Sequence, residues 1–146
     1  MAEIGVLIAA AGKGSRMGKD INKQFLNILG KPIIYHTIKS FLDWHRNFEL
    51  TIVLHPDEID YFKNKILPLF SEFKQQISLV KGGKSRKESV ANGLKNFSEE
   101  VNYVIIHDGA RPLLKKELIE RSYQAVKKYN AVSCGVKVKD TIKVVE

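Results

Sequence analysis

Apolar runs alternate with segments of helical periodicity along this chain. Nearly continuous apolar runs, typical of buried parallel strands, occur at residues 4–10, 50–54, 77–80, 103–106 and 131–138. Between them, apolar residues recur at helical spacing over 33–42, 58–69, 86–96 and 117–129. The alternation predicts an α/β protein with three layers, an α/β/α sandwich around a mostly parallel, Rossmann-like sheet.

No repeat, low-complexity segment or linker divides the chain, so residues 1–146 are predicted to form a single domain. The hydrophobic fraction of 44% and the charged fraction of 27% are those of a soluble globular protein. No apolar run approaches the ~20 residues of a membrane span, and the N-terminus lacks a signal-peptide pattern, so no membrane partner is expected. The single cysteine, Cys134, cannot form an internal disulfide, which favours a cytoplasmic protein, and its apolar neighbours predict that it is buried.

The charge balance favours anionic partners. Lys and Arg number 24 against 16 Asp and Glu, a net charge of +8. Such a charge fits either nucleic acid or small phosphorylated substrates. Many of the lysines fall on the predicted helices, where a solvated surface is the simpler interpretation, and neither an Arg-rich tail nor an RNA-binding aromatic motif is present. We therefore expect no nucleic-acid partner.

A glycine-rich segment directly follows the first predicted strand. Ala11, Gly12, Gly14 and Ser15 lead into the basic residues Arg16, Lys19 and Lys23. Backbone N–H groups of such a turn can approach an anion closely, and the cations can neutralise phosphate oxygens. The segment predicts a phosphate cradle, although the glycines alone fit an ordinary loop with a basic rim equally well.

Two better-known phosphate-binding motifs fail on spacing here. The dinucleotide fingerprint requires a glycine at position 17, which is Met17. The P-loop requires four residues between its glycines and Ser or Thr after the lysine, but five residues separate Gly12 from Gly18, and Asp20 follows Lys19.

Two further segments with candidate chemistry also follow predicted strands. Asp108 comes two residues after the strand predicted at 103–106, where a carboxylate suits Mg²⁺, although a helix cap or an ion pair with Arg111 would explain it too. Gly83 would let a flat base approach the backbone, and Ser89 offers it a donor and an acceptor; Ser85 fits a helix cap instead. Because ligands bind outside the carboxyl ends of parallel strands, the three segments are expected to converge on one active site.

These segments resemble those of a known family in their order and in their amino-acid sequences. The run A-A-G-x-G-x-R-M-G, followed by K-Q, is similar to the opening of sugar-nucleotide pyrophosphorylases and cytidylyltransferases, whose nucleotide-binding fold is glycosyltransferase-A-like. With G-G-x-x-R-x-x-S-V, H-D-G-A-R-P and V-K-D-T-I-K in order, the whole chain resembles the 2-C-methyl-D-erythritol 4-phosphate cytidylyltransferases. Ribitol 5-phosphate cytidylyltransferases share this architecture, but the sequence of residues 109–112 is more similar to that of the methylerythritol branch.

The resemblance implies a role for each residue that matches the motifs. Lys84 departs from them, since some relatives have an acidic residue there that contacts the nucleotide, and base selectivity through this position is therefore open. The implied set is Ala10, Ala11, Gly12, Gly14, Ser15, Gly83, Arg86 and Ser89 for the nucleotide, Arg16 and Lys23 for catalysis, Asp108 for Mg²⁺, and Arg111 and Thr141 for the acceptor.

The family reaction joins CTP to methylerythritol phosphate, a sugar-alcohol phosphate, and releases pyrophosphate in non-mevalonate isoprenoid biosynthesis. The resemblance implies that the chain is the N-terminal portion of a longer enzyme, homodimeric when complete, whose activity in this shortened form stays open. A non-catalytic nucleotide or nucleic-acid-binding module is the alternative from another class. Such a module has no need for the lone strand-end carboxylate of Asp108.

Overall fold

Four parallel strands form the centre of the computed structural model, which describes residues 2–12, 22–139 and 143. Their order is β5-β4-β1-β6, and Ile8 of β1 lies opposite Ile52 on one side and His107 on the other. The strand order reverses between β1 and β6, which is where open α/β sheets bind their ligands. The strands are β1 (Ile4–Ala10), β4 (Phe48–Leu54), β5 (Ile77–Lys81) and β6 (Tyr103–Asp108).

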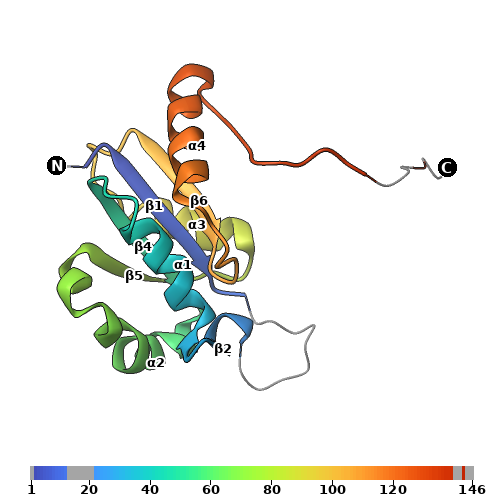
Figure 1. Cartoon of the computed structure of the whole chain (residues 1–146). Helices are drawn as coiled ribbons and strands as arrows, with labels where there is room; N and C mark the ends of the chain where they lie inside the picture. Colours follow the sequence, from blue (N-terminus) through green and yellow to red (C-terminus); the bar gives the residue numbers. More distant parts are fainter. Residues whose placement is uncertain (1, 13–21, 140–142, 144–146) are drawn as a thin grey trace.

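Helices cover both faces of this sheet (Figure 1). On one face, α1 packs on the even-numbered side chains of β1 and β4, and α4 packs on α1 and β6. On the other face, Gly93 of α3 lies against the side chains of Leu7 and Val53. The predicted three-layer sandwich and its parallel, Rossmann-like sheet are therefore confirmed. The helices are α1 (Ile33–Leu42), α3 (Arg86–Leu94) and α4 (Lys116–Tyr129).

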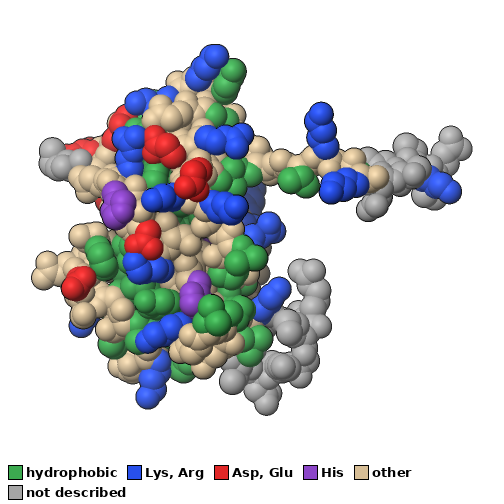
Figure 2. All heavy atoms as spheres, in the orientation of Figure 1, with side chains coloured by type: hydrophobic (Ala, Val, Ile, Leu, Met, Phe, Trp, Pro, Cys, Tyr) green, Lys and Arg blue, Asp and Glu red, His purple; other side chains and the backbone are tan. Residues whose placement is uncertain are grey.

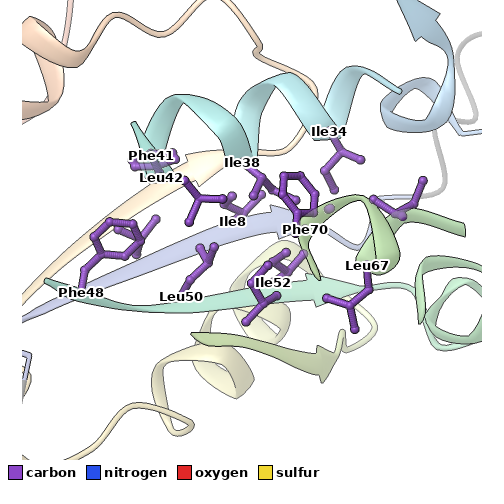
Figure 3. Packing of buried hydrophobic residues seen from close by; sticks show 14 of the residues in the cluster. Ile8, Ile34, Ile38, Phe41, Leu42, Phe48, Leu50, Ile52, Leu67 and Phe70 are labelled. Atoms are coloured by element: carbon purple, nitrogen blue, oxygen red, sulfur yellow. The ribbon is translucent and has the colours of Figure 1, made fainter. Parts of the chain in front are cut away.

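The larger part of the core lies between α1 and the sheet (Figure 3). Ile34, Ile38 and Phe41 of α1 are fully buried and point toward the strands. Burying such side chains contributes roughly 1.5–3 kcal/mol each. This core fixes the strands, and hence the loops at their carboxyl ends.

The predicted helix at 58–69 is instead a succession of short helical turns. Pro68 has no backbone N–H to continue a helix, and Phe70 leaves helical geometry with φ −120° and ψ 39°. Phe62, Ile66 and Phe70 nevertheless keep one buried stripe, so the apolar period is retained while the hydrogen-bonding pattern changes. The turns are η3 (Pro56–Glu58), α2 (Ile59–Tyr61), η4 (Phe62–Ile66) and η5 (Leu67–Gln76).

A small antiparallel ribbon precedes α1. Strands β2 (Asn27–Ile28) and β3 (Lys31–Pro32) pair antiparallel, and the two residues between them, Leu29 and Gly30, have φ of 52° and 77°. Two positive φ values in a two-residue loop fit the natural twist of a hairpin.

The predicted strand at 131–138 is wrong. After Asn130 the chain leaves α4 and runs away from the body of the molecule as an exposed segment without strand pairing (Figure 1). A β-strand forms only where a neighbouring strand accepts and donates its backbone hydrogen bonds. In the described part of the chain, this segment has no such neighbour, despite its apolar pattern. Cys134 is accordingly exposed, not buried, with Sγ 3.4 Å from Ser122 Oγ.

The surface agrees with a solvated distribution of charge. On the face shown in Figure 2, Lys and Arg side chains are scattered among acidic ones and form no single stripe. Among the described helices, none has the length and apolar character needed to cross a membrane.

Candidate nucleotide-binding site

The loops after β1, β5 and β6 meet at one edge of the sheet, as predicted. Gly82 lies so close to Ala11 that an added Cβ would come within 2.4 Å of the Ala11 Cβ. Gly82 N donates to Leu54 O at 2.7 Å, and Gly109 N donates to Ala9 O at 2.9 Å. Glycine at 82 is therefore needed for the close approach of the loops after β1 and β5.

The segment after β5 is fixed by a network at the start of α3. Ser85 caps the helix by accepting from Glu88 N at 3.1 Å, and the Glu88 carboxylate accepts from Lys84 N at 2.8 Å. The buried Ser89 hydroxyl accepts from Gly83 N at 3.0 Å and donates to Ser85 O at 2.8 Å. The capping role considered for Ser85 is confirmed. The only O–H donor of Ser89 is used in the hydrogen bond to Ser85 O. Toward a nucleotide base, the Ser89 hydroxyl can therefore act only as an acceptor.

A pocket of about 720 Å³ lies between these loops. Its walls come from the first loop, from the start of the segment after β4 and from the start of α3. A cavity of this size is in the range that takes a nucleotide-sized ligand. Its lining residues are Ala9, Ala11, Gly12, His55, Pro56, Glu88, Ser89 and residues 82–86.

Asp108, at the end of β6, lies between two arginines. Arg86 Nη2 is 2.8 Å from Asp108 Oδ1, and Arg111 Nε is 2.8 Å from Oδ2. The contact with Arg86 is between charges only, because Oδ1 is buried and accepts no hydrogen bond among the described residues. Both arginines are mostly exposed, at 65% and 75%, so each can leave the carboxylate when a ligand binds.

A second, smaller pocket lies on the Arg111 side of Asp108. It measures about 330 Å³ and is lined by His107, Arg111, Pro112, Leu113 and Leu114. The two arginines that contact Asp108 thus each line a different pocket, Arg86 the larger and Arg111 the smaller. The Thr37 hydroxyl holds this loop to α1, since it donates to Gly109 O at 2.9 Å.

His107 precedes Asp108 and is largely buried. Its ring contacts Phe41 edge-on at 5.5 Å between centroids, and its Nδ1 has no hydrogen-bond partner in the described part of the chain. Burial lowers the pKa of His107 below its ordinary value, against the opposing charge of Asp108. The imidazole is therefore neutral at physiological pH.

Lys23 lies in a short turn, η2 (Lys23–Phe25), that is attached to the end of β1. Gln24 Nε2 donates to Ala10 O at 2.7 Å, and both Gln24 and Asn22 donate to the carboxylate of Glu58. Burial raises the pKa of Glu58, opposed by the hydrogen bond from Asn22. The Lys23 side chain is exposed and forms no ion pair with any residue that the structure describes.

Most of the predicted site residues therefore lie at this edge, while four lie outside the described residues, namely Gly14, Ser15, Arg16 and Thr141. Sequence reasoning missed Gln24 as an anchor, Glu58 as its acceptor and Thr37 as the tie to the third loop. The K-Q pair was visible in the motif, but nothing in the sequence shows that Glu58 lies beside it. The predicted site residues that the structure brings together at this edge are Ala10, Ala11, Gly12, Lys23, Gly83, Arg86, Ser89, Asp108 and Arg111.

Comparison with known proteins identifies the family of the chain. Residues 4–146 match the profile of the family described as 2-C-methyl-D-erythritol 4-phosphate cytidylyltransferase. The chain belongs to this family.

Curated relatives in this family carry the same name. The one from Clostridium novyi (strain NT) is 46% identical over 139 residues, which cover 95% of this chain and 59% of the relative. The one from Alkaliphilus oremlandii (strain OhILAs) is 42% identical over 144 residues, which cover 99% of this chain and 61% of the relative. The chain thus spans about three fifths of the length of the curated relatives it matches.

The crystal structure of 4-diphosphocytidyl-2C-methyl-D-erythritol synthase from Anaerococcus prevotii DSM 20548 has the same fold. It superposes with a TM-score of 0.83 at 28% identity, covering 99% of this chain and 60% of that one.

Proposed function

We propose that this chain is the nucleotide-binding part of a cytidylyltransferase that transfers CMP from CTP to 2-C-methyl-D-erythritol 4-phosphate and releases pyrophosphate. Family membership supports the reaction class, and the relatives' shared name supports the substrate. Because the chain spans only about three fifths of those relatives, the complete reaction is proposed for the complete protein.

The observation that carries this proposal is that Asp108 contacts two arginines, each of which lines a different pocket. The larger pocket has the glycine-lined walls that suit a nucleotide. The smaller pocket presents Arg111, whose guanidinium suits the phosphate of the acceptor. A transfer between two phosphorylated molecules needs a binding site for each of them, whereas a simple nucleotide-binding module needs only one.

The chemistry needs no general base. The phosphate monoester of the acceptor is already an anionic nucleophile, and its oxygen forms a bond to the α-phosphorus of CTP. The bond from that phosphorus to the bridging oxygen breaks, and pyrophosphate leaves with the electron pair. Negative charge collects on the non-bridging oxygens, which Lys23 and Arg16 are proposed to stabilise.

Asp108 fits the needs of a bound Mg²⁺. Magnesium typically uses one or two carboxylates together with substrate phosphates, and no group of three or more candidate metal ligands occurs in the part of the chain that the structure describes. The buried Oδ1 of Asp108 accepts no hydrogen bond there, and Arg86, 2.8 Å away, is mostly exposed and would have to give way to the cation. When bound, Mg²⁺ supplies charge neutralisation to the phosphate oxygens.

The decisive experiment measures pyrophosphate release from CTP with Mg²⁺, using this chain and its full-length form. Methylerythritol phosphate and ribitol 5-phosphate are compared as acceptors. We expect turnover of the full-length protein with methylerythritol phosphate. Turnover with ribitol 5-phosphate alone would identify the protein as a ribitol 5-phosphate cytidylyltransferase. If neither acceptor led to pyrophosphate release, the acceptor assignment would be refuted.

Binding measurements separate the enzyme from a non-catalytic module. We expect CTP to bind more tightly than ATP or GTP and to require Mg²⁺. Binding that ignores the base, survives EDTA and weakens steeply with salt would support an electrostatic module instead.

We further propose that the complete protein is a cytoplasmic homodimer, as the resemblance implies. Light scattering of the full-length protein at micromolar concentration checks the dimer, and a monomeric mass would refute it.

A further inference from the structure

The turn that carries Lys23 is held on both sides by one carboxylate. Asn22 Nδ2 donates to Glu58 Oε1, and Gln24 Nε2 lies 3.4 Å from Glu58 Oε2. A side-chain amide has two N–H donors, so Gln24 Nε2 can also donate to Ala10 O, at 2.7 Å. The three side chains of Asn22, Gln24 and Glu58, here called the Glu58 clasp, thus join the turn to the end of β1.

The clasp also joins Lys23 to the wall of the larger pocket. Glu58 ends η3, and its backbone N–H donates to His55 O at 2.9 Å. His55 and Pro56 line the pocket, so the carboxylate connects this wall with the turn. The end of β1, the segment after β4 and the Lys23 turn therefore form one hydrogen-bonded unit.

Apolar packing also attaches the turn to the domain. Phe25 is buried and contacts the edge of Tyr61 at 5.1 Å between ring centroids. Placing a partly buried carboxylate beside that contact costs free energy unless its hydrogen bonds offset the cost. What the polar clasp adds to the packing is direction, because hydrogen bonds fix the orientation of the backbone on either side of Lys23.

We propose that Glu58 and Gln24 are positioning residues, which hold Lys23 in a fixed place beside the end of β1. This inference rests on the proposed function, in which Lys23 stabilises the charge that develops on the α-phosphate. Both carboxylate oxygens of Glu58 already accept amide donors, so Glu58 acts through Lys23 and has no need to contact the substrate.

The kinetic test is a double-mutant cycle on the full-length protein. Glu58→Gln replaces one acceptor oxygen by a donor, so one of the two amides loses its partner. We expect kcat to fall about 10-fold while KM for CTP changes less than about twofold, since misplacement of a catalytic group acts mainly on the transition state. In a Lys23→Ala background the same substitution should lower kcat by less than about twofold, because the group being positioned is gone.

The matched control is Asp60→Asn, which removes an exposed carboxylate two residues away. It should leave both constants unchanged. Equal effects of Glu58→Gln in the two backgrounds, or an effect on KM alone, would overturn the positioning role. Asn22→Ala is a second variant. It removes the hydrogen bond between Asn22 and Glu58 but keeps the one between Gln24 and Glu58, so it should give a smaller fall in kcat.

Trypsin reports on the clasp without any need for activity. Cleavage after Lys23, followed by mass spectrometry, should be about 10-fold faster in Glu58→Gln than in the wild type, because a released turn fits a protease more readily. Asp60→Asn should be cleaved at the wild-type rate. Unchanged cleavage in Glu58→Gln would overturn the clasp itself. If the wild type releases no pyrophosphate with any acceptor, the catalytic part fails together with the proposed function, and the cleavage rates still decide the clasp.

Discussion

At the scale of single residues, the close contact between α3 and the sheet depends on Gly93, which has no side chain. A Cβ at Gly93 would lie 2.6 Å from both Leu7 Cδ1 and Val53 Cγ2. Alanine at an ordinary helix position is favoured over glycine by roughly 0.5–1 kcal/mol, but overpacking a core costs about 1–3 kcal/mol. We therefore expect Gly93→Ala to lower the free energy of unfolding by about 1 kcal/mol in urea titrations.

Gly135 provides the control for this prediction. It lies in the exposed segment after α4, and an added Cβ would have no atom within 4 Å. Gly135→Ala should change the free energy of unfolding by less than about 0.5 kcal/mol. A stabilised Gly93→Ala protein would show that α3 is free to move away from the sheet.

Lys23 is the residue on which the proposed catalysis can be tested most directly. Its side chain is exposed, so its removal should hardly change stability. Loss of one group that stabilises transition-state charge typically costs about 100- to 1,000-fold in kcat. We expect Lys23→Ala to show a loss of this size in full-length protein, with a much smaller change in KM for CTP, and Lys63→Ala, which is exposed on η4, to behave like the wild type. A kcat comparable to that of the wild type would exclude a transition-state role.

His107 should make stability depend on pH. Burial lowers its pKa in the folded state, so the unfolded chain binds a proton that the folded chain does not. Stability should therefore fall as pH decreases through about 6.5, the ordinary value for histidine, and level off below the folded-state pKa. Urea titrations between pH 5 and 7.5 should show a smaller slope for His107→Gln than for the wild type. An identical slope in the two proteins would mean that His107 is not the group responsible.

At the scale of elements, α4 is attached to the domain by both apolar and charged contacts. Ile119 and Tyr123 are buried against the core. Beside them, the Glu120 carboxylate accepts from Arg46 Nη2 at 2.7 Å and from Trp44 Nε1 at 2.9 Å. These bonds, that from Arg46 first, lower the pKa of Glu120 to about 2.

The attachment of α4 should therefore weaken in acid. A carboxylate with a depressed pKa contributes stability that is complete above its ordinary pKa, near 4.5, and is lost as pH falls from there toward 2. The difference in unfolding free energy between the wild type and Glu120→Gln should shrink over this range. Glu117→Gln, an exposed change on the same helix, should show no such trend. A difference that stays constant with pH would assign the effect of Glu120 to packing.

Local pattern was enough to predict the elements that bury a whole face. The apolar runs of β1 and β4 and the periodicity of α1 are strong because all three elements lie in the main core. The error at 131–138 has a different cause, since an apolar run becomes a strand only when a neighbouring strand accepts its hydrogen bonds. For the predicted helix at 58–69 the apolar period was right, but the structure forms short helical turns there, and Pro68 cannot donate the hydrogen bond that a regular helix would need.

The candidate site could be predicted as far as its motifs are local. Asp108 and Gly83 follow strands, and the rule for parallel sheets brings them to one edge. The contacts between Glu58 and Gln24 and between Thr37 and Gly109 join residues 34 and 72 positions apart. No periodicity or spacing relates such positions, so only the folded structure reveals them.

At the scale of the whole molecule, the described body ends at α4. Asn130 closes this helix in a left-handed conformation, with φ 63° and its N–H donating to Val126 O at 2.8 Å. Residues 131–139 are exposed and lie outside the core cluster. Folding and nucleotide binding should therefore depend on residues before 131, whereas use of the acceptor is proposed to involve Thr141.

Removing residues 131–146 should separate these functions. We expect the free energy of unfolding in urea to change by less than about 0.5 kcal/mol, because exposed segments contribute little. CTP affinity measured by calorimetry should stay within about twofold of the intact chain, since every described residue of the larger pocket is retained. Thr141→Ala in the full-length protein should raise KM for methylerythritol phosphate while leaving KM for CTP unchanged. A large loss of stability or of CTP affinity on truncation would mean that the segment after α4 packs against the domain in solution and takes part in the nucleotide site.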